Sequence, residues 1–113
     1  NFEAPHIREA KALLQQADAP QAILVDCSHA NSGKRFEQQP AVAANVAEQI
    51  AGGERAIIGV MLESHLVAGT QKVVPGQALT YGQSITDGCL AFDDVVPVLE
   101  GLANAVIARR GAI

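Results

Sequence analysis

Three side chains that could bind a metal ion lie at the ends of apolar segments or in a tight turn. His29 comes just after the apolar run 22–25, and Glu63 directly follows the apolar run 56–62. Asp87 stands next to a glycine in a turn-forming sequence. One imidazole and two carboxylates suit a hard or borderline divalent cation such as Mn²⁺, Fe²⁺ or Zn²⁺. Their spacing matches no short metal-binding motif, so the fold must bring them together.

Each of these residues also has an ordinary structural explanation. A loop histidine such as His29 can simply bond to the backbone, and its position does not separate the two interpretations. Glu63 can be solvated in the loop after its strand, since a carboxylate there needs a cation, a donor or water. Asp87 is explained by turn geometry alone unless His29 and Glu63 already define a site.

The remaining candidates for chemistry are weaker. His65 is expected to be a surface residue or a hydrogen-bond partner of a ligand, and Lys34 and Arg35 could meet a substrate phosphate. Adjacent charges in a loop are usually just solvated, and we favour that interpretation for this pair. Cys27 is expected to be buried as a small apolar residue. Cys27 and Cys89 are too few and too far apart for a disulfide framework or a CxxC site, which predicts free thiols in a reducing compartment.

The elements that must position these residues alternate between helix and strand. Apolar spacing predicts a helix over 4–17 and later helices starting at Pro40 and near Asp93. The last helix is expected to carry its apolar stripe at Val95, Leu99, Leu102 and Val106, and the stretch 72–76 could form a short hairpin. Continuous apolar runs predict strands over 21–27 and from about 55 to 62, of the kind found in buried parallel sheets. The order indicates an α/β protein with two parallel strands and flanking helices. The carboxyl ends of the two strands are expected to lie at one edge of the sheet.

Length, composition and charge exclude several classes of protein. The 113 residues are 49% hydrophobic, enough for one small domain with a core. A net charge of -4 and 4% aromatic residues leave no basic stripe or stacking surface, so we expect no nucleic-acid partner. Neither a bilayer-spanning apolar run nor a signal peptide is recognisable, which favours a cytoplasmic protein with no membrane partner.

Two strands that are apolar on both faces need further strands beside them, because an exposed apolar edge promotes aggregation. The sequence supplies no such strands, and it begins at Asn1 rather than methionine. We therefore expect residues 1–113 to form a single partial domain, the C-terminal part of a larger barrel or doubly wound sheet. The alternative is that strands come from other copies of the chain in a homo-oligomer.

Several long stretches carry a family resemblance. They are DCSHANS at 26–32, QIAGGE at 49–54, IIGVMLESHL at 57–66, YGQSITDGC at 81–89 and LANAV at 102–106. In this order they closely resemble the C-terminal portion of the bacterial, feedback-regulated type I 3-deoxy-D-arabino-heptulosonate 7-phosphate (DAHP) synthases. The resemblance covers nearly the whole chain from about Ala22.

The resemblance implies the C-terminal part of a (β/α)₈ TIM barrel, with the two predicted strands as its last two. It also implies a metal-dependent transferase that condenses phosphoenolpyruvate with erythrose 4-phosphate, the first committed step of the shikimate route to aromatic amino acids. Family members hold the metal with a cysteine, a histidine, a glutamate and an aspartate. By motif the last three fall on His29, Glu63 and Asp87, and Asp26 is a candidate partner for the other ring nitrogen of the histidine.

The family's cysteine ligand and its phosphoenolpyruvate-binding arginines and lysines lie on strands that precede Asn1, and Cys27 does not replace that cysteine. With three of four ligands, the chain alone is expected to be inactive. One functional hypothesis is therefore a part of an enzyme that works only in the complete barrel. The alternative is a noncatalytic oligomerising fragment or assembly module that retains an unused ligand set.

Overall fold

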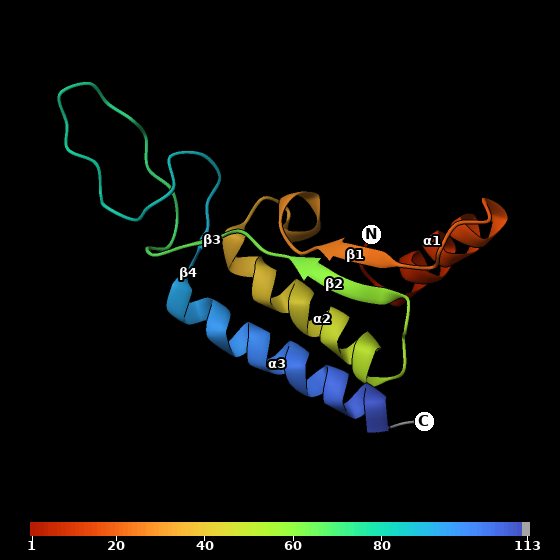
Figure 1. Cartoon of the computed structure of the whole chain (residues 1–113). Coiled ribbons are helices and arrows are strands. Elements are labelled where there is room, and N and C mark those ends of the chain that lie inside the picture. Colours follow the sequence, from red (N-terminus) through yellow and green to blue (C-terminus); the bar gives the residue numbers. More distant parts are fainter. Residues whose placement is uncertain (112–113) are drawn as a thin grey trace.

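Helices and strands alternate along the chain in the computed structural model, which describes residues 1–111 (Figure 1). The elements are α1 (Ala4–Gln16), β1 (Ile23–Asp26), the 3-10 helices η1 (His29–Ser32) and η2 (Phe36–Gln38), α2 (Gln39–Ala51), β2 (Ile57–Met61), β3 (Ser64–His65), β4 (Leu90–Ala91) and α3 (Phe92–Gly111). The predicted mixed α/β class, with two main strands and three helices, is confirmed.

Strands β1 and β2 form a two-stranded parallel sheet, with Val25 opposite Val60 and Asp26 opposite Met61. Helix α2 connects them, which makes a β-α-β unit. Because the strands are parallel, both carboxyl ends lie at one edge of the sheet, and the segments that follow them start side by side. This edge is where the sequence analysis expected its three candidate ligands.

Helices α2 and α3 run side by side and cover one face of the sheet (Figure 1). At the far end of α3, Arg109 Nη1 donates to the carbonyl oxygens of Glu54 and Ile57, at 2.8 and 3.1 Å, and so ties the helix to the start of β2. The buried residues between the helices and the sheet form one core cluster: Ile7, Val25, Val46, Ile50, Ile57 and Ala105.

The opposite face of the sheet is uncovered in the part of the chain that the structure describes. Side chains alternate between the faces of a strand, so Val25 and Ile57 point into the core while their neighbours Leu24 and Ile58 point away. Leu24 is 60% exposed and Ile58 is 68% exposed, whereas Ile57 is 1% exposed. Two large apolar side chains therefore lie bare on this face.

Local sequence explains where the helices begin and how they face. Pro5 and Pro40 stand in the first turns of α1 and α2, where the missing N–H costs no helical hydrogen bond. Asp93 lies inside the first turn of α3 rather than capping it, because the helix already begins at Phe92.

The expectation that Leu99 belongs to the buried stripe of α3 is wrong, because its side chain is 52% exposed. Ala105 is buried and Val98 packs against the core, and both lie on the opposite side of the predicted stripe from Leu99. The buried face of the helix is therefore centred away from Leu99.

The passage from 66 to 89 differs most from expectation. The possible hairpin at 72–76 is only a turn, in which the Gln77 N–H bonds to the Val74 carbonyl. Pairing occurs instead between β3 and β4, which form a short parallel sheet beyond the end of β2. The loop between them extends away from the helices (Figure 1).

Among residues 1–111, no helix combines the length and apolar character needed to cross a bilayer.

Candidate metal centre

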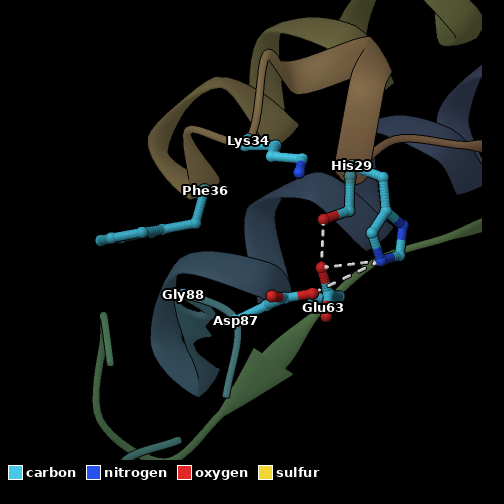
Figure 2. A pocket seen from close by; sticks show the side chains of 7 residues that line it. His29, Lys34, Phe36, Glu63, Asp87 and Gly88 are labelled. Atoms are coloured by element: carbon cyan, nitrogen blue, oxygen red, sulfur yellow. Dashed lines mark hydrogen bonds and ion pairs between the residues drawn. The ribbon is translucent and has the colours of Figure 1, made fainter. Parts of the chain in front are cut away.

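The side chains of His29, Glu63 and Asp87 meet in one small pocket at the carboxyl edge of the β1–β2 sheet (Figure 2). The cavity measures about 130 Å³. Its complete lining is Ser28, His29, Lys34, Phe36, Glu63, Asp87 and Gly88. The fold thus brings together three residues that lie far apart in the sequence.

The separations between the donor atoms suit a shared cation. His29 Nε2 lies 3.6 Å from Glu63 Oε1 and 3.5 Å from Asp87 Oδ2, and one ligand atom from each residue lies within 4.8 Å of the others. Two ligand atoms that each bind a metal at about 2.1 Å in tetrahedral geometry stand roughly 3.4 Å apart. The three groups therefore fit a divalent ion by donor type and by spacing, with small adjustments.

Asp26 organises the turn that carries the histidine. Its Oδ1 accepts from the Ser28 N–H at 2.8 Å, its Oδ2 lies 2.8 Å from His29 Nδ1, and its carbonyl accepts from Asn31 Nδ2 at 2.8 Å. The expected contact between Asp26 and the imidazole is thus present. These bonds fold residues 28–31 back over the end of β1, so that the ring faces Glu63 and Asp87.

The contact with Asp26 also sets the tautomer of His29. A carboxylate can only accept, so Nδ1 carries the proton and Nε2 of the neutral ring keeps its lone pair for a metal. The Asp26 hydrogen bond and charge, joined by the charges of Glu63 and Asp87, raise the pKa of His29 above its ordinary value. The backbone of His29 has a φ of 43°, a left-handed conformation that non-glycine residues seldom adopt and that is common at functional sites.

Glu63 is the most enclosed of the three candidate ligands, with a side chain that is 24% exposed. The Ser28 hydroxyl donates to Glu63 Oε1. This bond leaves the second carboxylate oxygen without a protein donor among the described residues. Ser28 is itself 4% exposed, so it holds the carboxylate from a fixed position.

Asp87 approaches the pocket from the long loop, and its side chain is 65% exposed. The loop is closed by two backbone bonds between Gly69 and Cys89, at 2.8 and 3.1 Å. Phe36 packs against Gly88, where an added Cβ would lie only 2.7 Å from the ring. These contacts return the chain to the pocket directly before β4, which explains why Asp87 converges with residues more than twenty positions away.

Several candidates stay outside the site. His65 is exposed, and its Nδ1 accepts only from the N–H of Leu66 at 2.8 Å, so it is a surface histidine. Cys27 is fully buried, and burial together with the Asp26 charge raises its pKa to about 11. Both cysteines are free, as expected. Arg35 is exposed and does not line the pocket.

Sequence reasoning missed two residues of the pocket wall, Ser28 and Phe36, and it favoured a merely solvated charge for a third, Lys34. Lys34 is exposed, as the expectation of a solvated charge required, but it also points toward the pocket (Figure 2). Lys34 has a φ of 61° and follows Gly33, which is also in the left-handed conformation. These two residues reverse the direction of the chain, so that the Lys34 side chain turns back to the pocket. A Gly-Lys pair shortly after a candidate ligand was the available signal.

Changing Asp26 to asparagine is expected to lower the pKa of His29, because Asp26 is the largest cause of its rise. Loss of the charged partner should also weaken Mn²⁺ binding by about 10–100-fold, the usual effect of removing a group behind a metal ligand. An NMR titration of the imidazole and Mn²⁺ calorimetry measure the two effects. Asp18→Asn, which removes the same charge at an exposed position before β1, is the control and should change neither.

Comparison with known proteins gives a consistent set of matches. Residues 1–100 match the DAHP synthetase I family. The Phe-sensitive phospho-2-dehydro-3-deoxyheptonate aldolase of Escherichia coli K12 is 53% identical over 111 residues, which cover 98% of this chain. The phospho-2-dehydro-3-deoxyheptonate aldolase of Haemophilus influenzae is 46% identical over 112 residues, or 99% of this chain.

A solved structure shows the same arrangement. The phospho-2-dehydro-3-deoxyheptonate aldolase of Francisella tularensis SCHU S4 superimposes with a TM-score of 0.92 and 45% sequence identity, over 96% of this chain and 31% of that chain. The match covers 32% of the Escherichia coli relative and 31% of the Haemophilus influenzae relative. The chain therefore spans about a third of the length of the curated relatives it matches.

Proposed function

The chain belongs to the DAHP synthetase I family, and from this premise we propose that it is the part of a DAHP synthase that holds most of the metal site. The proposed enzyme is a transferase that joins phosphoenolpyruvate to erythrose 4-phosphate in the shikimate pathway. The observation that carries the proposal is the convergence of His29, Glu63 and Asp87, each from a family motif, on one pocket.

We further propose that residues 1–113 are one partial domain, the C-terminal part of a (β/α)₈ barrel. Strands β1 and β2 would be the last two strands of that barrel. Helices α2 and α3 lie on one face of the strands, where the outer helices of a barrel belong. Leu24 and Ile58, bare on the other face, would then point into the barrel and be covered by strands not contained in this sequence.

In this proposal His29 Nε2, Glu63 and Asp87 hold a divalent cation, Mn²⁺, Fe²⁺ or Zn²⁺, and a cysteine outside this sequence completes the set. When bound, such an ion polarises a carbonyl oxygen and makes its carbon electrophilic, here the aldehyde of erythrose 4-phosphate. Asp26 keeps the Nδ1 proton in place, so that Nε2 stays available as a ligand. The Ser28 hydroxyl fixes the orientation of the Glu63 carboxylate.

Two further side chains of the pocket wall set its charge and its access to water. Both substrates carry phosphate groups, and the Lys34 ammonium at the pocket wall supplies a positive charge beside two carboxylates. The Phe36 ring, packed on Gly88, closes one side of the pocket and limits the access of water to the reacting groups. The chain thus orients ligands and balances charge, while the clamp for phosphoenolpyruvate lies elsewhere in the complete enzyme.

A noncatalytic assembly module is the second candidate function. The bare apolar face around Leu24 and Ile58 favours it, because the same surface could pair with another copy of the chain. Metal titration separates the two candidates. Mn²⁺ binding that is lost in His29→Ala supports the enzyme part, and no binding at millimolar Mn²⁺ supports the module.

The proposal is tested by a chimera in which this chain replaces the matching third of the Escherichia coli K12 relative. The chimera is expected to form DAHP in a Mn²⁺-dependent assay, whereas the 113-residue chain alone is expected to form none. The same chimera with His29→Ala should be inactive while melting at the same temperature. A folded, metal-loaded chimera without activity contradicts the proposal, as does full activity of the His29→Ala chimera.

A further inference from the structure

Gln39 is a fully buried polar residue whose whole side-chain amide is used on the backbone of one residue, Glu63. It is 0% exposed and is the first residue of α2. Its Oε1 accepts from the backbone N–H of Glu63 at 2.8 Å, and its Nε2 donates to the backbone carbonyl of Glu63 at 3.1 Å. This two-sided contact copies the hydrogen bonds that an adjacent β-strand would make.

Glu63 needs such a partner because it lies between two sheets. The last backbone bond on the β1 side of this segment runs from the N–H of Cys27, directly after β1, to the Met61 carbonyl, at 2.9 Å. Pairing with β4 starts when the N–H of Leu90 donates to the Glu63 carbonyl, at 3.0 Å. On the side facing α2, the Gln39 side chain alone supplies backbone partners to Glu63 among the described residues.

The backbone N–H and C=O of Glu63 therefore connect all three candidate ligands. Gln39 ends the segment that begins with His29 and passes through η1 and η2. Leu90, which bonds to the same carbonyl oxygen, follows Asp87 by three residues. A shift of the Glu63 backbone would change its distance to His29 and to Asp87 together.

We propose that Gln39 is a positioning residue that fixes the backbone of Glu63, so that its carboxylate meets His29 and Asp87 at metal-binding distance. The inference rests on the proposed function, because the position of Glu63 matters to a cation only if the site binds one. Gln39 does not line the pocket; it acts through the main chain of the ligand residue Glu63. The sequence shows it only as an ordinary helix-start glutamine.

The test compares Mn²⁺ binding by the 113-residue chain with that of Gln39→Met, which keeps the side-chain length and removes both hydrogen bonds. We expect Mn²⁺ affinity to fall by about 10–100-fold, the range seen when a group that orients a ligand is removed. Hydrogen exchange of the Glu63 amide should become faster in the same variant. Calorimetry and NMR measure the two effects.

Gln49→Met is the matched control. Gln49 also lies in α2 and uses its amide, at 2.8 Å each, on the Phe2 carbonyl and on Asn45 Oδ1, far from the pocket. Its loss should lower the melting temperature without changing Mn²⁺ affinity more than twofold. A metal effect as large as that of Gln39→Met would show that general destabilisation is responsible and would overturn the inference.

The outcomes separate the inference from the proposed function. If Mn²⁺ binding is lost in Glu63→Gln but unchanged in a folded Gln39→Met, only the inference is overturned. If the wild-type chain binds no Mn²⁺, the proposed function fails and the inference falls with it. Should Gln39→Met fail to fold, Gln39→Asn takes its place, since its amide is one methylene too short to reach both atoms of Glu63; unchanged affinity in that variant also overturns the inference.

Discussion

Replacing Glu63 by glutamine is expected to weaken Mn²⁺ binding on the order of 100-fold or more, since a direct ligand should matter at least as much as the groups behind it. The substitution keeps the shape of the side chain and removes its charge. Its Oε1 lies 3.6 Å from His29 Nε2, so the lost charge is at the centre of the donor set. Isothermal calorimetry with Mn²⁺ measures the change directly.

Glu100→Gln is the control for Glu63→Gln, because Glu100 is an exposed residue of α3 and loses the same charge. Its Mn²⁺ affinity should equal that of the wild type. Thermal melting of both variants shows whether the fold is kept. Equal affinities in the wild type and in folded Glu63→Gln would contradict the metal site, and the pocket would then be a cluster of acidic groups around a histidine.

The general position of the site could be predicted from the sequence because it depends on a local rule. Parallel strands end at a common edge, so His29 and Glu63 were expected to lie close together once the runs before them were interpreted as strands. The structure places their side chains in one pocket. The contact from Asp26 to His29 spans only three residues, and such local hydrogen bonds follow from the chain itself.

The remainder of the site depends on contacts between distant segments, which no local pattern encodes. The Ser28 hydroxyl reaches Glu63 across 35 positions, and the Gln39 amide reaches it across 24. Asp87 enters the pocket because β3 and β4 pair, although each has only two residues. Strands this short carry no periodicity, and the loop between them contains apolar residues that a hairpin could also have used.

The orientation of the helices shows the same limit. The spacing of apolar residues predicted the position of α3 correctly, but it misplaced Leu99 on the buried face. A helix with apolar residues on most sides offers several possible faces, and the one that is buried is chosen by its neighbours. Here α2 and the sheet select the side that carries Val95 and Ala105.

Truncating Ile57 to alanine is expected to lower the free energy of unfolding by about 2–5 kcal/mol, the usual cost of removing a buried isoleucine side chain. Ile57 is 1% exposed and belongs to the core cluster between β2 and the helices. A domain of this size is stable by only about 5–15 kcal/mol, so the variant should unfold at much lower denaturant concentration. Equilibrium unfolding in urea, followed by circular dichroism, gives the difference.

Ile58→Ala is a control one residue away, with the same chemistry on the opposite face. Ile58 is 68% exposed, so in the isolated chain its truncation should change the free energy of unfolding by only about 0.5 kcal/mol or less. A loss as large as that of Ile57→Ala would contradict an uncovered face and would indicate that another copy of the chain covers it. In the chimera, where further barrel strands would lie over Ile58, the same substitution should become costly. The contrast between the two contexts would identify the bare face as the barrel interior.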